Sequence, residues 1–156
     1  MRRTEVIHAG GSLITRVTDA IERHVELTVF EHVDAAVDEA RIVTVTGRVL
    51  EEATLDRLAD VIGPVEGVVA LHNQVSVLPA SSRDRELGLG TARAVYGHPG
   101  LWRYGMDGRS SIHVVVEHGR VTLAGTVDSE ADRVLAEVAA QAAAARPVAN
   151  CLRTTE

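Results

Sequence analysis

Apolar and polar residues alternate with a period of two in the stretch HVVVEHGRVTLAGTV, residues 113–127. This alternation predicts two β-strands joined at His118-Gly119, because glycine adopts positive φ angles freely and histidine tolerates them in a two-residue turn. Pairing across that turn places Val116 opposite Val121, Val114 opposite Leu123 and Ile112 opposite Gly125. These residues form an apolar face expected to face a core, and the other, largely polar face is expected to face solvent.

Four other segments repeat apolar residues at helical spacing. The predicted helices cover residues 13–27, 51–62, 85–96 and 130–145. Ser12 and Ser129 are suitable N-caps for the first and last of them, and Gly63-Pro64 ends the second. Four more strands are predicted at 29–37, 43–49, 69–77 and 148–154. The elements therefore run αββαβ twice.

The sequence itself repeats at the same spacing. VTVTGRV at 43–49 and VTLAGTV at 121–127 share the pattern V-T-x-x-G-x-V at an offset of 78 residues, and Asn73 and Asn150 lie 77 residues apart. Such repetition indicates two copies of one structural unit. We predict an α+β fold with an N-terminal tail at 1–12, a first domain at 13–79 and a second at 83–156. Each domain is expected to contain a small three-stranded mixed sheet covered on one face by two helices.

Five residues are predicted to specify this fold rather than to bind a ligand. Gly47 and Gly125 occupy the same strand position in the two copies, where a missing side chain permits a bulge or a closely packed helix. Gly119 serves the hairpin turn. Asn73 and Asn150 are expected to tie down a turn through their side chains.

Composition and charge narrow the possible functions. The chain is 46% hydrophobic and carries a net charge of −6, which argues against broad nucleic-acid binding because phosphates require a basic surface. Its single cysteine excludes an intramolecular disulfide and a cysteine-based zinc site within one chain. We find no signal-peptide pattern and no apolar run of about 20 residues. We therefore expect no transmembrane segment and, unless a segment precedes Met1, a cytoplasmic location.

The repeated pattern resembles the BON domain, an αββαβ module of osmotically induced periplasmic proteins and nodulation-type proteins of bacteria. The resemblance rests on residues 112–132 and 150–153 in the second copy and on 65–75 in the first. It implies a non-enzymatic module of the cell envelope, often exported, that attaches to phospholipid surfaces or envelope proteins under stress. Two features depart from the family pattern: residues 142–145 are all alanine where V-P-G-V is usual, and the first hairpin turn lacks glycine.

Three of the four aromatic residues gather in YGHPGLWRYGM, residues 96–106. Aromatic rings beside arginines suit a membrane interface or a protein hot spot, because each ring buries an apolar body while its polar tip stays hydrated. The predicted ligand or partner surface consists of Arg93, Tyr96, Leu101, Trp102, Arg103, Tyr104 and Arg109. The alternative is that Leu101, Trp102 and Tyr104 close one end of a small core.

The two copies differ in charge. Residues 13–79 carry five arginines and twelve acidic residues, whereas residues 83–156 carry nine of each. An anionic bilayer should therefore repel the first copy, and the second is expected to make any lipid contact.

No catalytic motif, phosphate loop or cofactor motif is present, so we expect no enzyme activity and no cofactor. His113, Glu117 and His118 come nearest to a metal-binding cluster, but metal ligands normally converge from several elements, so no metal site is expected. The leading hypothesis is a tandem binding module for a phospholipid surface or an envelope component. The alternative is a protein-interaction or chaperone-like stress module that uses exposed sheet edges. The oligomeric state stays open.

Overall fold

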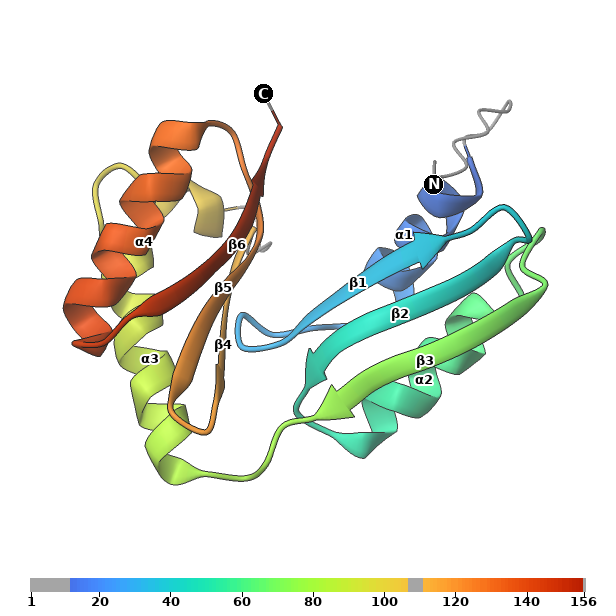
Figure 1. Cartoon of the computed structure of the whole chain (residues 1–156), viewed down its shortest axis with the longest axis horizontal. Coiled ribbons are helices and arrows are strands. Elements are labelled where there is room, and N and C mark those ends of the chain that lie inside the picture. The colour runs from blue at the N-terminus through green and yellow to red at the C-terminus, as the bar shows by residue number, and fades with distance from the viewer. Residues whose placement is uncertain (1–11, 107–110, 156) are drawn as a thin grey trace. The chain divides into compact units, whose positions relative to one another are not determined.

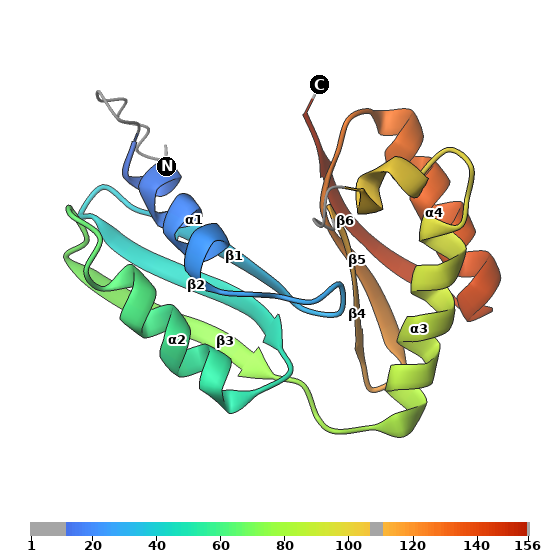
Figure 2. The same ribbon diagram turned by 180° about the vertical axis from the view of Figure 1, so that it is seen from behind.

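The structure is a computed structural model that describes residues 12–106 and 111–155, and the chain forms two compact units (Figure 1). Within the described residues, the first unit contains 12–27 and 33–78. The second unit contains 28–32, 79–106 and 111–155. In each unit both helices cover the same face of a three-stranded sheet (Figures 1 and 2). The predicted α+β fold with two αββαβ units is confirmed.

The first unit follows the predicted order of elements. Its elements are α1 (Leu13–His24), β1 (His32–Val37), β2 (Ile42–Val49), α2 (Glu52–Ile62) and β3 (Ala70–Val77). The strand order is β1-β2-β3, and β3 runs parallel to β2. Val17 and Ile21 of α1 pack with Val45 of β2 and Leu58 and Ile62 of α2 in the buried core. The helix α1 ends three residues earlier than predicted, at the extended residue Val25.

The second unit repeats this arrangement and adds a short 3-10 helix. Its elements are α3 (Ser82–Tyr96), η1 (Trp102–Gly105), β4 (Ile112–Glu117), β5 (Arg120–Val127), α4 (Glu130–Ala144) and β6 (Val148–Thr154). The hairpin pairs Val116 with Val121, Val114 with Leu123 and Ile112 with Gly125, as the alternation predicts. All of these side chains except that of the glycine belong to the buried core.

The opposite face of this hairpin is less exposed than the alternation predicts. Val115 and Ala124, both expected to face solvent, are only 8% and 7% exposed. The alternation therefore assigned the two side chains to the correct face of the hairpin, but the prediction that they are exposed to solvent is wrong.

Different chemistry closes the two hairpin turns. His118 and Gly119 both have positive φ, 52° and 77°, which is the backbone of a primed turn. The Asp84 carboxylate of α3 accepts both of their N–H groups at 3.0 Å. The glycine-free turn of the first unit uses Arg41 at φ 65°, and the Asp38 side chain accepts the N–H of Ile42 at 2.9 Å.

The repeated glycines and asparagines have matching roles. Gly47 and Gly125 adopt φ of 138° and 119°, a backbone conformation that favours glycine. Asn73 donates its amide to the carbonyl of Leu55 and accepts the N–H of Val75. Asn150 repeats both bonds, with Arg133 in α4 and Leu152 in β6. Each asparagine thus joins the last strand of its unit to the neighbouring helix rather than closing a turn.

The segment Thr28–His32 packs in the second unit. The N–H of Val114 donates to the carbonyl of Val29 at 2.7 Å, so this segment lies along strand β4. The buried Gly88 of α3 leaves room for Phe30, because a Cβ at this position would lie 3.3 Å from the Phe30 ring. Packing thereby offsets the cost of a glycine inside a helix.

Candidate functional site

The candidate site is the segment between α3 and β4, which the sequence singled out for its aromatic residues. The chain leaves α3 at Gly97 and turns back at His98, whose ring nitrogen Nδ1 accepts the N–H of Gly100 at 3.0 Å. Leu101 is fully buried in the core and fixes the start of η1. The 3-10 turn that follows places Trp102 and Arg103 at the surface and Tyr104 inward.

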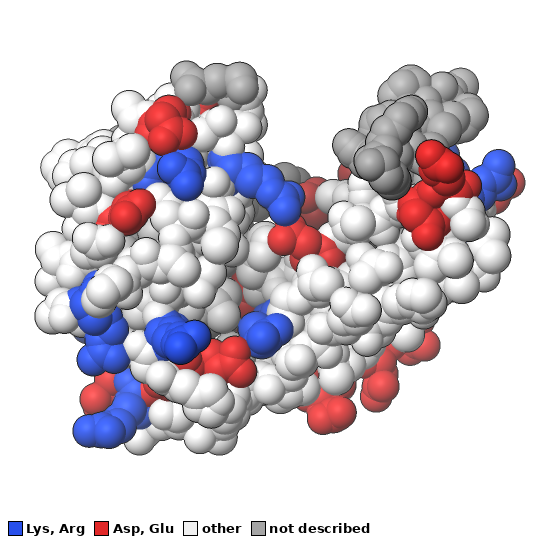
Figure 3. Space-filling view, in the orientation of Figure 1, with Lys and Arg blue, Asp and Glu red and all other residues white. Residues whose placement is uncertain are grey.

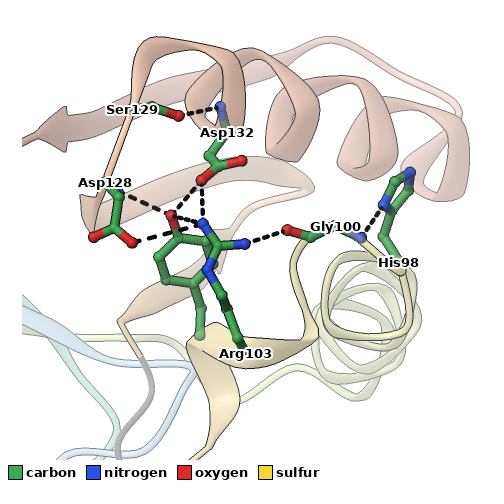
Figure 4. A network of polar contacts seen from close by, with 7 residues as sticks. His98, Gly100, Arg103, Asp128, Ser129 and Asp132 are labelled. Atoms are coloured by element: carbon green, nitrogen blue, oxygen red, sulfur yellow. Dashed lines mark hydrogen bonds and ion pairs between the residues drawn. The ribbon is translucent and has the colours of Figure 1, made fainter.

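A polar network joins η1 to the N-terminus of α4 (Figure 4). The Tyr104 hydroxyl donates to the Asp132 carboxylate at 2.5 Å and accepts the backbone N–H of Asp128 at 2.9 Å. The Arg103 guanidinium donates to the same carboxylate at 2.6 Å and to the carbonyl of Gly100 at 2.8 Å. It also stacks on the Tyr104 ring, 4.5 Å from the ring centroid.

The network sets the charges of this surface. The hydrogen bond from Tyr104 and the nearby Arg103 lower the pKa of Asp132 below its ordinary value. Burial and the hydrogen bond to Asp132 raise the pKa of Tyr104. Asp128 lies 3.6 Å from the same guanidinium, so two carboxylates face the one arginine. Arg103 therefore adds no net positive charge to this part of the surface.

Several of the predicted surface residues are structural. Leu101 is 0% and Tyr104 7% exposed, so neither belongs to an exposed surface, contrary to the prediction, because both fill the core of the second unit. Tyr96 is partly buried, and its hydroxyl donates to the carbonyl of Ile112 and accepts the N–H of the same residue at 3.1 Å. Leu101 and Tyr104 fit the alternative, in which the segment closes the core, whereas Trp102, which that alternative also included, is exposed.

The remaining predicted surface residues differ in their exposure and in their contacts. Trp102 is 55% exposed, and Arg93 is exposed on α3. Arg103 lies at the surface but is engaged in the network. Arg109 lies outside the described residues. The sequence reasoning missed Met106, which is 49% exposed and follows η1 directly, and it missed the role of Asp128 and Asp132. The position of Met106 within the aromatic stretch was the available signal.

The surface seen in Figure 3 carries arginines interspersed with acidic side chains on the second unit, without a continuous basic patch on that face. Among the described residues, no group of three or more His, Cys, Asp or Glu side chains is arranged to hold a metal ion. None of the described helices combines the length and apolar character needed to cross a membrane.

Comparison with solved structures gives distant similarities. Two structures of CdsD, a structural protein of the type III secretion system of Chlamydia trachomatis, align at 18% identity with TM-scores of 0.32 and 0.33. The alignments cover 80% and 90% of this chain but only 57% and 62% of the other chains, so this chain spans about three-fifths of their length. At these TM-scores the similarity supports no functional inference. No curated protein matches the chain.

The sequence pattern that defines the BON domain matches two segments, residues 11–79 and 103–155. The first segment runs from the start of α1 to the end of β3, and the second from η1 to the end of β6. Together the two segments cover most of the chain. The first contains a whole αββαβ repeat, and the second contains its repeat without the first helix, α3. The protein therefore belongs to the BON domain family.

Proposed function

We propose that this protein is a non-enzymatic tandem binding module whose second unit attaches to phospholipid surfaces through Trp102 and Met106. One observation carries the proposal: these two apolar side chains stand at the start and just past the end of the short helix η1 and are 55% and 49% exposed. Tryptophan favours the headgroup region of a bilayer because its ring is apolar and its N–H stays hydrated.

The state of Arg103 changes the expected mode of binding. Its charge is matched by Asp128 and Asp132, and the whole chain carries a net charge of −6. Attraction to anionic lipid is therefore small, and insertion of the apolar side chains provides the driving force. Burying the exposed part of the Trp102 side chain is worth roughly 3 kcal/mol at most.

Co-sedimentation with vesicles tests the proposal. We expect binding to phosphatidylcholine vesicles, little increase when phosphatidylglycerol is added, and little dependence on salt. Trp102→Ala should weaken binding by about tenfold to a hundredfold. Val138→Ala, which trims an equally exposed apolar residue on α4 (59% exposed), is the matched control and should leave binding unchanged. Equal binding by wild type and Trp102→Ala would contradict the proposal.

A second candidate is attachment to an envelope protein through the same two residues. It is favoured by the pairing of Arg103, since an exposed tryptophan and a flexible methionine on a surface without net positive charge are typical of a protein hot spot. Absence of vesicle binding, together with partners in an envelope extract that are lost on Trp102→Ala but retained on Val138→Ala, would favour this candidate over the lipid surface.

A further inference from the structure

The last strands of the two units, β3 and β6, are edge strands in equivalent positions. Val45 pairs with Asn73 and Gly47 with Val75 in the first unit. Leu123 pairs with Asn150 and Gly125 with Leu152 in the second. In a parallel ladder, the N–H and C=O groups of every second residue point toward the neighbouring strand, and those of the residues between point away from it. Residues that occupy equivalent ladder positions in the two units therefore direct their N–H and C=O groups to the same side.

The edge of β6 is closed by side chains of α4. The Arg133 guanidinium donates to the carbonyl of Leu152 at 3.1 Å and to that of Asn150 at 3.3 Å. Glu137, one turn further along α4, accepts the Asn150 amide at 3.0 Å. These carbonyls point away from β5, and the guanidinium occupies the positions that a further strand would use.

The first unit lacks this closure. The repeat offset of 78 residues places Leu55 where the second unit has Arg133 and Ala59 where it has Glu137. Leu55 occupies the equivalent place in space too, because its carbonyl accepts the Asn73 amide just as the carbonyl of Arg133 accepts the Asn150 amide. Leucine and alanine donate no side-chain hydrogen bond. Among the described residues, no side chain donates to the carbonyls of Asn73 and Val75.

The Asn73 side chain accepts the N–H of Val75 at 3.1 Å and must release it when another strand pairs here, but the β3 edge lacks the stronger safeguards against pairing. Natural edge strands are protected by charged residues, proline or bulges. Residues 67–78 contain no charged residue and no proline, and β3 pairs with β2 over eight consecutive residues. His72, Asn73, Gln74 and Ser76 are exposed, and Val69, just before the strand, is 69% exposed.

We propose that the β3 edge binds the β3 edge of a second copy of this chain, in antiparallel orientation about a two-fold axis, and so forms a continuous six-stranded sheet. Two-fold antiparallel pairing brings identical segments together, so a charge near the axis would lie close to the same charge of the other copy, and an uncharged strand avoids that penalty. The same symmetry brings Leu55 and Val69 of each copy to the new junction, where both gain burial. This inference concerns the first unit and is independent of the proposed lipid contact.

Charge and size set the strength of this dimer. Residues 13–79 carry five arginines and twelve acidic residues, so two first units repel each other at low ionic strength. A pairing of eight residues per copy is also small beside a standard interface of about 800 Å² per partner. We therefore expect a reversible dimer with a dissociation constant of about micromolar or weaker, and tighter association at high salt.

Sedimentation velocity of the full chain over a concentration series tests the proposal. Wild type should form dimers that increase with salt. Leu55→Arg combined with Ala59→Glu transfers the closure of β6 to β3 and should raise the dissociation constant by about tenfold or more. The control, Val138→Glu with Ala142→Arg, places a neutral ion pair on the exposed face of α4 and should leave the dimer unchanged. Circular dichroism verifies that each variant is folded.

The reverse change gives a second readout. Arg133→Leu with Glu137→Ala removes the closure of the β6 edge, so the last strands of both units can pair and the folded chain should form species larger than a dimer. Wild type that stays monomeric up to about 1 mM would overturn the proposal and leave the edge to a strand of another protein. Loss of the dimer in the α4 control would overturn the proposal and point to α4 as the interface. A dimer that persists unchanged in the Leu55→Arg, Ala59→Glu variant would also overturn the proposal.

Discussion

Removing the Tyr104 hydroxyl tests whether the network at η1 holds the second unit together. In Tyr104→Phe, the Asp132 carboxylate loses one donor, and the N–H of Asp128 loses its acceptor. The ring itself stays in the core, so the packing of the 7% exposed side chain is preserved. The variant therefore isolates the hydrogen bonds from the apolar contacts.

The magnitude follows from the partners of the hydroxyl. A hydrogen bond to an ionised group contributes about 1.5 to 3 kcal/mol to stability, against about 1 kcal/mol for a neutral pair. Asp132 keeps its bond to Arg103, so we expect Tyr104→Phe to lower the free energy of unfolding of the second unit by about 2 kcal/mol. Tyr96→Phe removes bonds to the neutral backbone of Ile112 and should cost only about 1 kcal/mol.

Urea unfolding followed by tryptophan fluorescence provides the measurement. Trp102 is the only tryptophan in the chain and lies two residues from Tyr104, so its emission reports on the second unit alone. The midpoint should fall further in Tyr104→Phe than in Tyr96→Phe, with the slope against urea unchanged. A Tyr104→Phe midpoint equal to that of wild type, or above that of Tyr96→Phe, would show that the network contributes nothing beyond neutral bonds.

Three further outcomes follow from the second unit. The lowered pKa of Asp132 stabilises the fold at pH values above about 3.9, the ordinary pKa of aspartate, and this stability should be lost as the pH falls through the folded pKa. The Asp132→Asn variant should lack this pH dependence. Burial and the neighbouring His32 lower the pKa of His113, so the free energy of unfolding should decrease as the pH falls below about 6.5, where the unfolded histidine takes up a proton more readily. His113→Asn should reduce this dependence of the urea midpoint on pH between about 5 and 7.5, and an unchanged pH dependence would refute the reasoning. Gly125→Ala should cost about 3 kcal/mol or more, because its φ is 119° and a Cβ would lie 2.0 Å from the carbonyl oxygen of Ser111; a fully stable variant on thermal unfolding would contradict this.

The elements of the fold were predictable because each has a strong local signal. The alternation around His118 gave the complete register of β4 and β5, since a slip of one residue would turn every valine to the wrong face. Ser12 and Ser129 cap their helices as expected. Helix α4 ends at Ala144, with Ala145 in the left-handed conformation at φ 54°, although no glycine marks this position.

The environment of individual side chains was harder to predict. The aromatic stretch gave the location of the candidate site, but the same composition suits a core and a surface equally well. Only the three-dimensional positions of Asp128 and Asp132 show that Arg103 is paired and that Tyr104 points inward. The closure of β6 by Arg133 could not be predicted either, because it depends on which flank of α4 meets the strand.

The placement of Thr28–His32 has a consequence for how the protein can be divided. The backbone passes from one unit to the other three times, after Leu27, after His32 and after Leu78. A fragment that starts at Pro79 would omit Phe30, and the space beside Gly88 would open to water. Dividing the chain after Leu78 thus separates the second unit from its segment 28–32, and the second unit is expected to complete its folding only with that earlier segment attached.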